Sequence, residues 1–186
     1  MEFDIKKYNG IVEFIKSIHC TQVRSFTKIP YYTHCIRTAS LVMKFKKSHR
    51  LDALVIAALC HDTLEDDRLS APLNRAIIKQ EYGDLVVSLV DELTSDIEKI
   101  NYFGKTQYLC DKLEHMSTWA LVIKLCDRLD NVSDFIFCPD TFVQKYGLET
   151  RNILDHIKKN RNLTETHKRI IKEIERILRS YDICID

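Results

Sequence analysis

The sequence contains few residues that make tight turns: four glycines and three prolines among 186 residues. An all-β domain needs many short hairpin turns, and glycine is the residue that many of these turns require. Their scarcity argues against an all-β fold and favours helices. The 45% apolar and 30% charged residues are typical of a soluble globular protein with a sizeable core. We therefore expect an all-α fold, a single bundle of about eight to ten helices.

The sequence also lacks an excess of charge of either sign. Lysine and arginine number 28 against 27 aspartates and glutamates, which leaves a formal net charge of +1. Without a strong net charge the chain is not drawn to nucleic acid or to a membrane surface, so we expect neither as a partner. A small anionic substrate would have to be attracted by local cations. The sequence leaves the oligomeric state open.

Long apolar runs and paired cysteines are absent as well. No run approaches the length of a membrane span, and the N-terminal residues do not resemble a signal peptide. The seven cysteines are scattered singly, many inside apolar stretches, and no CxxC pair is present. This pattern favours reduced, buried thiols over disulfides or structural zinc. We therefore expect a cytoplasmic protein.

Apolar residues recur at helical spacing along most of the chain. Their spacing predicts helices over residues 4–19, 31–47, 52–65, 71–82, 84–93, 101–115, 119–135, from 140 onward, and 163–181. No repeat, low-complexity stretch or linker interrupts this series. We expect one domain over residues 1–186.

One stretch combines a buried helix with chemically active side chains. Residues 54–60 contain no polar side chain, and His61, Asp62, Glu65 and Asp66 follow at once. At about 100° per residue, these four side chains would fall within an arc of about 140° on one side of a continuous helix. The alternative is a helix that leaves the core, with solvated acids and a hydrogen-bonded core histidine. Desolvating an imidazole beside a carboxylate is costly without a compensating cation or hydrogen bond, which favours a metal.

Two further residues extend this candidate site. His34 lies near the start of the preceding predicted helix, and Asp127 lies on the predicted helix 119–135, four residues before Asn131 on the same face. Either alone would more often be an ordinary core or surface residue. With His61 and Asp62 they give two imidazoles and two carboxylates, a donor set that suits Mn²⁺, Fe²⁺, Co²⁺ or Zn²⁺. Four protein ligands leave open positions for water and substrate on an octahedral ion.

Four motifs carry a resemblance to a known family. An ordered histidine, His-Asp pair and aspartate is the signature of the HD superfamily of metal-dependent phosphohydrolases. HDTLED at residues 61–66 and KLCDRLDN at 124–131 resemble motifs of the (p)ppGpp hydrolase domain of RelA/SpoT-type enzymes and of stand-alone small alarmone hydrolases of the metazoan SpoT type. PYYTH at 30–34 and LVDELTSD at 89–96 match less distinctive stretches of the same family. The resemblance covers residues 20–155.

The resemblance implies a role for each matching residue. The metal ligands would be His34, His61, Asp62 and Asp127. The attacking water would be handled by Glu65 and Asp66. Substrate contacts would come from Arg24 near the purine and, elsewhere, from Asn131, Lys105 and Tyr146.

Other cations could add to this substrate site. Lys28 lies in the same loop as Arg24, while Lys124 and Arg128 share a helix face and either bind phosphate or pair with neighbouring acids. The chain departs from the family pattern on the nucleotide side, at Ser25, at Thr27-Lys28-Ile29 and at Cys35.

Three hypotheses follow for the function. The first is a manganese-dependent hydrolase that removes pyrophosphate from the 3′ position of guanosine tetra- or pentaphosphate. The second keeps the metal but acts as a phosphatase on another nucleotide or dinucleotide ester. The third is an HD domain that binds a nucleotide without catalysis. No synthetase motif follows the hydrolase motifs, so we expect the chain only to degrade an alarmone.

Overall fold

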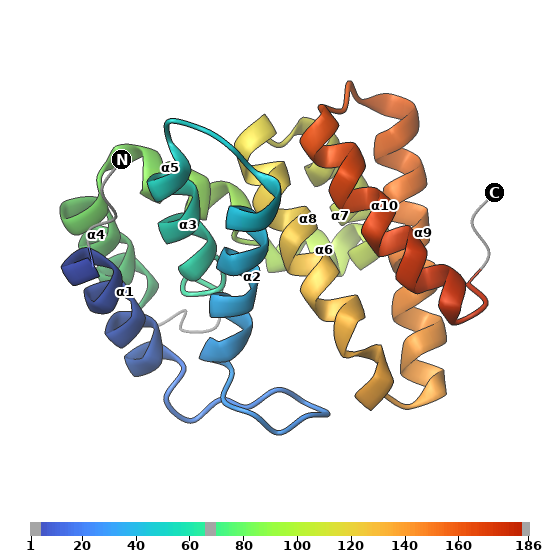
Figure 1. Ribbon diagram of the computed structural model, residues 1–186, viewed down its shortest axis with the longest axis horizontal. Helices are drawn as coiled ribbons and strands as arrows, with labels where there is room; N and C mark the ends of the chain where they lie inside the picture. The colour runs from blue at the N-terminus through green and yellow to red at the C-terminus, as the bar shows by residue number, and fades with distance from the viewer. Residues whose placement is uncertain (1–4, 66–69, 184–186) are drawn as a thin grey trace. The chain divides into compact units, whose positions relative to one another are not determined.

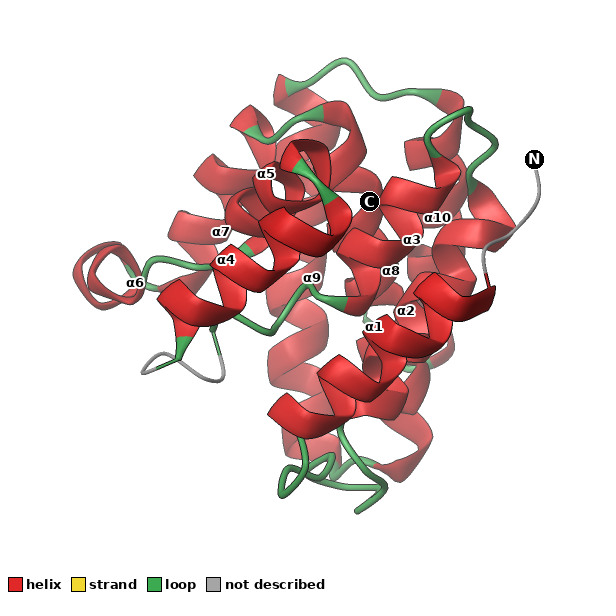
Figure 2. Ribbon diagram, turned by 90° about the vertical axis from the view of Figure 1, so that its left-hand side faces the viewer, coloured by secondary structure: helices red, strands yellow, loops and turns green. Residues whose placement is uncertain are grey.

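The computed structural model describes residues 5–65 and 70–183. Within these ranges the chain is built of helices joined by loops, as Figure 1 and Figure 2 show. No strand occurs in this part of the chain, apart from an isolated antiparallel bridge between Val23 and Pro30. The prediction of an all-α fold is confirmed.

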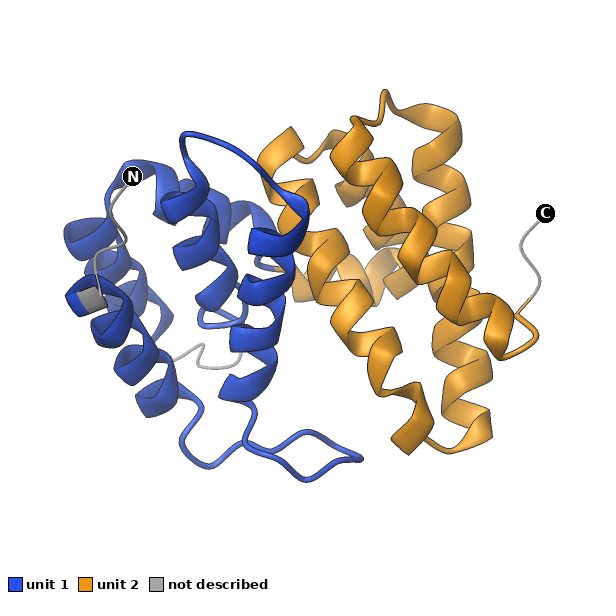
Figure 3. Cartoon of the chain, in the orientation of Figure 1, with its two compact units in different colours: residues 1–94 blue, residues 95–186 orange. Residues whose placement is uncertain are grey.

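The helices group into two compact units, residues 1–94 and 95–186 (Figure 3). The first unit contains α1 (Ile5–Ile18), α2 (Tyr32–Phe45), α3 (Leu51–Leu59), α4 (Ala71–Tyr82) and α5 (Asp84–Leu93). In this unit α3 packs against α1, α2 and α5. Its residues 54–59 are all buried, as expected of a helix without a polar face. The apolar run of the sequence therefore forms the central helix of this unit.

The second unit contains α6 (Ile97–Phe103), α7 (Lys105–His115), α8 (Thr118–Ser133), the 3₁₀ helix η1 (Asp134–Phe137), α9 (Asp140–Asn160) and α10 (Glu165–Ser180). Here α8 packs against α10, and α7 packs against α9. Most of α8 is buried, including the charged residues Asp127, Arg128 and Asp130. A buried charge is retained only when partners compensate for its desolvation, so these positions point to a site.

The expected helix over residues 52–65 is wrong at its C-terminal end. The helix α3 ends at Leu59, and residues 60–65 form successive turns, in which the amides of Thr63 and Glu65 donate to carbonyls three residues earlier. Two side chains also engage backbone carbonyls here: His61 Nδ1 lies 2.8 Å from the oxygen of Ala58, and Thr63 Oγ1 donates to the oxygen of Cys60 at 2.8 Å. His61, Asp62 and Glu65 therefore lie in turns, and the prediction that these three side chains share one helix face is wrong.

The expected helix over residues 101–115 is also inaccurate. Gly104, with φ of +80°, separates α6 from α7, and glycine adopts this conformation without the steric cost that a side chain brings. The helix α6 begins earlier than expected because Asp96 caps it, its carboxylate accepting from the amides of Glu98 and Lys99.

No helix in residues 5–65 and 70–183 is long and apolar enough to cross a membrane.

Candidate metal centre

The ring of His61 has its orientation and its tautomer fixed by the backbone. Its Nδ1 lies 2.8 Å from the carbonyl oxygen of Ala58, at the end of α3. A carbonyl only accepts, so Nδ1 carries the proton and donates to it. In the neutral ring, Nε2 then presents its lone pair away from the helix. This is the arrangement by which proteins prepare a histidine to bind a metal.

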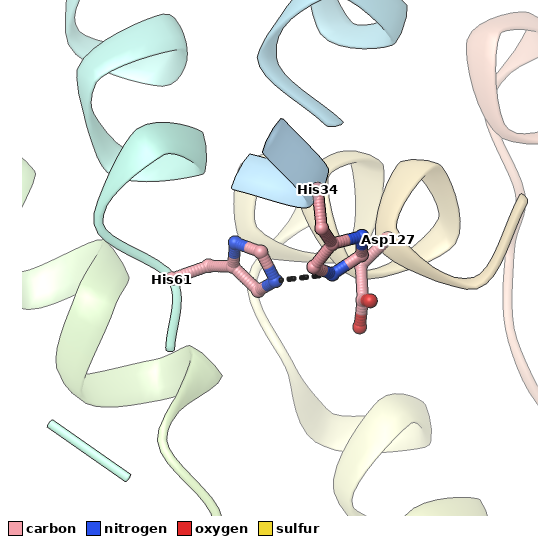
Figure 4. Close-up of side chains that lie close together, drawn as sticks. All are labelled: His34, His61 and Asp127. Carbon is pink, nitrogen blue, oxygen red and sulfur yellow. Dashed lines mark hydrogen bonds between the residues drawn. The ribbon is translucent and has the colours of Figure 1, made fainter. Parts of the chain in front are cut away.

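His34 presents its own Nε2 to the same point. It is the third residue of α2 and is buried, and its Nε2 lies 3.2 Å from Nε2 of His61. Figure 4 draws the two rings with a dashed line between these nitrogens. Without a cation, one of the two nitrogens has to carry a proton. A metal ion would instead accept both lone pairs.

Asp62 brings a third donor atom to the two imidazoles. Its Oδ2 lies 2.9 Å from Nε2 of His61 and 3.8 Å from Nε2 of His34. Donor atoms that share one metal at about 2.1 Å lie about 3 to 4 Å from one another. The two imidazoles and the carboxylate, all from the first unit, therefore fit a divalent transition metal.

Asp127 lies in the second unit, on α8. Asp127 is buried, and its carboxylate oxygens are possible metal ligands. Figure 4 draws its side chain together with those of His34 and His61. Within its own unit, Lys124 Nζ lies 2.8 Å from Oδ2, and Asn131 Nδ2 donates to Oδ1 at 2.7 Å. Asp127 and Asn131 thus share a helix face, as their spacing predicted, and a hydrogen bond joins their side chains.

Of the two predicted proton carriers, Glu65 and Asp66, the structure describes only Glu65. Glu65 is half-buried in the turn that follows Asp62, and its amide donates to the carbonyl of Asp62 at 3.1 Å. Asp66 lies outside the described residues.

Two cysteine thiols beside the predicted metal ligands are protonated. Cys60 precedes His61, and Cys126 precedes Asp127. Burial raises the pKa of both thiols well above the usual range, because a thiolate would lose its hydration in the core. Among the described residues, the group of donor atoms close enough together to hold one ion includes neither thiol.

The loop before α2 carries the two cations predicted for the first unit. The guanidinium carbon of Arg24 lies 6.0 Å from the centre of the Tyr31 ring. The amide of Arg24 donates to Ile29, and the amide of Lys28 donates to Arg24, so the loop closes on itself. Lys28 has φ of +57°, a conformation that is uncommon outside glycine.

Lys105 and Tyr146 lie together in the second unit. Lys105 Nζ is 5.7 Å from the centre of the Tyr146 ring and 3.6 Å from Oε1 of Glu149. The guanidinium carbon of Arg128 is 5.0 Å from the centre of the same ring, and Arg128 also reaches Glu149 and Thr150. Burial raises the pKa of Tyr146, so its hydroxyl stays protonated. Lys105 and Tyr146, two of the predicted substrate residues of this unit, thus lie in one cluster with Arg128 and Glu149.

Sequence reasoning missed two contributors to these clusters. Tyr31 donates its hydroxyl to Oδ2 of Asp62 at 2.7 Å, and Glu149 holds Arg128 and Lys105. The pairing of Arg128 with an acid, which the sequence left open, is confirmed. Tyr31 belongs to the PYYTH motif, whereas Glu149 had no motif to mark it.

The helical fold and the His-Asp site define an HD-type protein, and comparison agrees. The chain belongs to the HD domain family, whose model matches residues 12–162. The family predicted from the motifs is confirmed.

Two curated relatives are similar to this chain over most of its length. The chain is 31% identical over 150 residues to a guanosine-3′,5′-bis(diphosphate) 3′-pyrophosphohydrolase of Aquifex aeolicus, a match that covers 76% of this chain and 19% of the relative. It is 29% identical over 136 residues to a probable enzyme of the same name from Mycoplasma pneumoniae, covering 68% of this chain and 18% of that one. The chain thus spans about a fifth of the length of these curated relatives.

A solved structure matches the whole fold. A metazoan ortholog of SpoT, described as hydrolysing ppGpp, superposes with a TM-score of 0.77 at 20% identity, covering 99% of this chain and all of that one. At this identity the match establishes the fold, and it confirms the predicted HD-type helical architecture.

Proposed function

We propose that this chain is a divalent-metal-dependent hydrolase that removes pyrophosphate from the 3′ position of guanosine tetra- or pentaphosphate and leaves GDP or GTP. The observation that carries the proposal is the approach of two imidazole nitrogens and one carboxylate oxygen within 3.8 Å of one another inside the first unit. The likeness to 3′-pyrophosphohydrolases supports the choice of substrate.

The proposed metal ligands are His34, His61 and Asp62, with Asp127 as the fourth. Support for Asp127 comes from its burial, its anionic donor atoms and its place in the KLCDRLDN motif. We propose Mn²⁺ as the metal because the mixed nitrogen and oxygen donors suit it, with Fe²⁺, Co²⁺ or Zn²⁺ as alternatives. When bound, such an ion lowers the pKa of a bound water and polarises a phosphoryl oxygen.

The acids after the His-Asp pair are proposed to manage the proton of the attacking water. In the reaction, the water oxygen bonds to the phosphorus that carries the 3′ oxygen, and the bond from phosphorus to that oxygen breaks. The water must lose a proton, and the leaving 3′ oxygen must gain one. Glu65, in the turn next to Asp62, is suited to accept the first proton on its carboxylate, and Asp66 is proposed to share this task.

The substrate-binding residues proposed from the sequence are Arg24, Lys28, Lys105, Tyr146 and Asn131. Arg24 would stack against the base and Lys28 would meet a phosphate, because the loop before α2 carries both cations. Lys105 and Tyr146 would bind further phosphate and sugar, and Asn131 would orient Asp127 or touch the nucleotide.

We further propose that residues 1–186 act as one HD-type domain in the cytoplasm. The family match over residues 12–162 supports the first part, since it draws on both units. The free thiols of the cysteines in the described residues support the second, because a reducing compartment keeps thiols unpaired.

Product analysis tests the substrate and the bond that is cleaved. The purified chain is stripped of metal and incubated with guanosine tetraphosphate, with and without Mn²⁺, and the products are resolved by anion-exchange chromatography. We expect GDP and pyrophosphate only with Mn²⁺, and a turnover at least about 10²-fold lower in Glu65→Gln, which keeps the shape of Glu65 but accepts no proton. Orthophosphate released from a 2′- or 3′-nucleotide, with no pyrophosphate from the alarmone, would establish the phosphatase alternative. Tight binding without turnover would establish the non-catalytic one.

A further inference from the structure

The hydroxyl of Tyr31 is hydrogen-bonded to the carboxylate of Asp62, which is proposed as a metal ligand. It donates to Oδ2 of Asp62 at 2.7 Å, and this same oxygen lies 2.9 Å from Nε2 of His61. We infer that Tyr31 is a positioning residue, which holds Asp62 in the orientation that binds the metal. The inference rests on the proposed function only in taking Asp62 as a ligand.

The ring of Tyr31 is fixed on several sides. Tyr31 immediately precedes α2, its amide donates to Gln22 at 2.9 Å, and its carbonyl accepts from the amide of His34 at 2.9 Å. Its ring centre lies 5.1 Å from that of His19 and 5.6 Å from that of His34. Burial lowers the pKa of His19, so at neutral pH its ring is uncharged, and its Nδ1 is hydrogen-bonded to Gln22. The direction of the hydroxyl is therefore set by the fold.

A fixed donor on Oδ2 has a specific effect on Asp62. A carboxylate rotates easily about its last torsion, and either oxygen can face a metal. Each oxygen offers about two lone pairs, so one on Oδ2 can accept from Tyr31 while the other remains for a metal. Carboxylates that bind metals are themselves hydrogen-bonded, and loss of such a partner typically costs about 10- to 100-fold in metal affinity. Tyr31 thus orients Asp62 before the metal arrives.

The neighbouring tyrosine provides a matched comparison. Tyr32 is the first residue of α2, and its ring lies 5.7 Å from Nζ of Lys16, a residue of α1. Replacing either tyrosine by phenylalanine removes one hydroxyl and keeps the ring. Tyr31→Phe keeps the ring beneath the Arg24 guanidinium as well, so it separates the hydroxyl from any effect on the loop.

The experiment measures metal binding without substrate. Wild-type, Tyr31→Phe and Tyr32→Phe chains are stripped with a chelator and titrated with Mn²⁺ alone, and free Mn²⁺ is followed by electron paramagnetic resonance. We expect an affinity about 10- to 100-fold lower for Tyr31→Phe and an unchanged affinity for Tyr32→Phe. Thermal unfolding of the metal-free chains checks the fold. Hydrolysis of guanosine tetraphosphate by Tyr31→Phe should recover at saturating Mn²⁺, which would not occur if the substitution damaged the fold.

The outcomes separate this inference from the proposed function. Equal Mn²⁺ affinities for Tyr31→Phe and wild type would overturn the inference, whatever the substrate, and so would an equal loss in Tyr32→Phe. A weaker affinity confined to Tyr31→Phe, with no pyrophosphate released by any variant, would sustain the inference and reject the proposed reaction.

Discussion

Asp127 is a buried carboxylate that is compensated within its own helix. Lys124 and Asn131 lie one turn before and after it, and they engage its two oxygens at 2.8 and 2.7 Å. The lysine compensates the negative charge, and the amide fixes the direction of Oδ1. The proposed role of Asp127 as a metal ligand can therefore be tested separately from the proposed role of Asn131 as its hydrogen-bond partner.

Substitutions at these two positions should affect the metal differently. Asp127→Asn keeps the size of the side chain but removes the anionic donor, so we expect loss of both bound metal and turnover. Asn131→Ala removes only a supporting hydrogen bond and should weaken metal binding by about tenfold while retaining measurable turnover. Metal per chain after gel filtration, measured by mass spectrometry, checks both. Full metal occupancy in Asp127→Asn would remove this residue from the ligand set.

For single residues, the sequence predicted which side chains could bind a metal better than it predicted how those side chains are oriented. The types and order of His34, His61 and Asp62 were enough to predict a metal site, because few other roles combine buried imidazoles with a carboxylate. The role of Tyr31 could not be predicted, because the PYYTH motif does not indicate which side chain the hydroxyl of this tyrosine reaches. Which hydroxyl meets Asp62 depends on the turn that opens α2 and on the turn that follows α3.

At the scale of the helices, the spacing of apolar residues predicted which helices form. It did not predict where several of them end. The helix α3 stops at Leu59, and in the turns that follow the side chain of His61 bonds to the carbonyl of Ala58 and that of Thr63 to the carbonyl of Cys60. Periodicity of apolar residues contains no information about such bonds. The break between α6 and α7 did have a signal in the sequence, at Gly104, which the apolar pattern alone overrode.

The N-terminus of α10 depends on one buried histidine. The Nε2 of His167 lies 3.0 Å from the carbonyl oxygen of Thr118, and its Nδ1 accepts from the amide of Thr164. Because the carbonyl only accepts and the amide only donates, the ring is neutral with its proton on Nε2. This ring therefore ties the starts of α8 and α10 together within the second unit.

Removing this ring should destabilise the chain. His167→Ala removes a fully buried ring and leaves a cavity, and it also removes the partner of the Thr118 carbonyl and of the Thr164 amide, so we expect a loss of about 2 to 4 kcal/mol in the free energy of unfolding. The matched control is His115→Ala, at the exposed end of α7, which should change stability little. Urea unfolding followed by circular dichroism measures both. Equal effects of the two substitutions would refute a special role for His167.

For the whole molecule, the proposed site should couple metal binding to folding. Two separate segments of the first unit bring the three donors together, His34 on α2 and the His61-Asp62 pair after α3. In the unfolded chain, 26 residues stand between His34 and His61, so no preformed site remains. A ligand that binds only the folded state stabilises it, by about 2.7 kcal/mol at 100 times its dissociation constant.

Mn²⁺ should therefore raise the unfolding temperature of the metal-free chain, and a chelator should reverse the effect. For a chain of this size the gain above corresponds to roughly 5 to 10 °C. Ca²⁺ should stabilise less, because it prefers six to eight oxygen donors and gains little from imidazoles. Scanning calorimetry with wild type and His34→Gln measures this, since the variant loses one nitrogen donor and should respond weakly. An equal response of the variant and the wild type would place the bound Mn²⁺ elsewhere on the chain.

Hydrogen exchange extends the test to the second unit. If Asp127 is the fourth ligand, Mn²⁺ should slow amide exchange in α8 as well as in α2. Slowing confined to the first unit would limit the ligands to His34, His61 and Asp62.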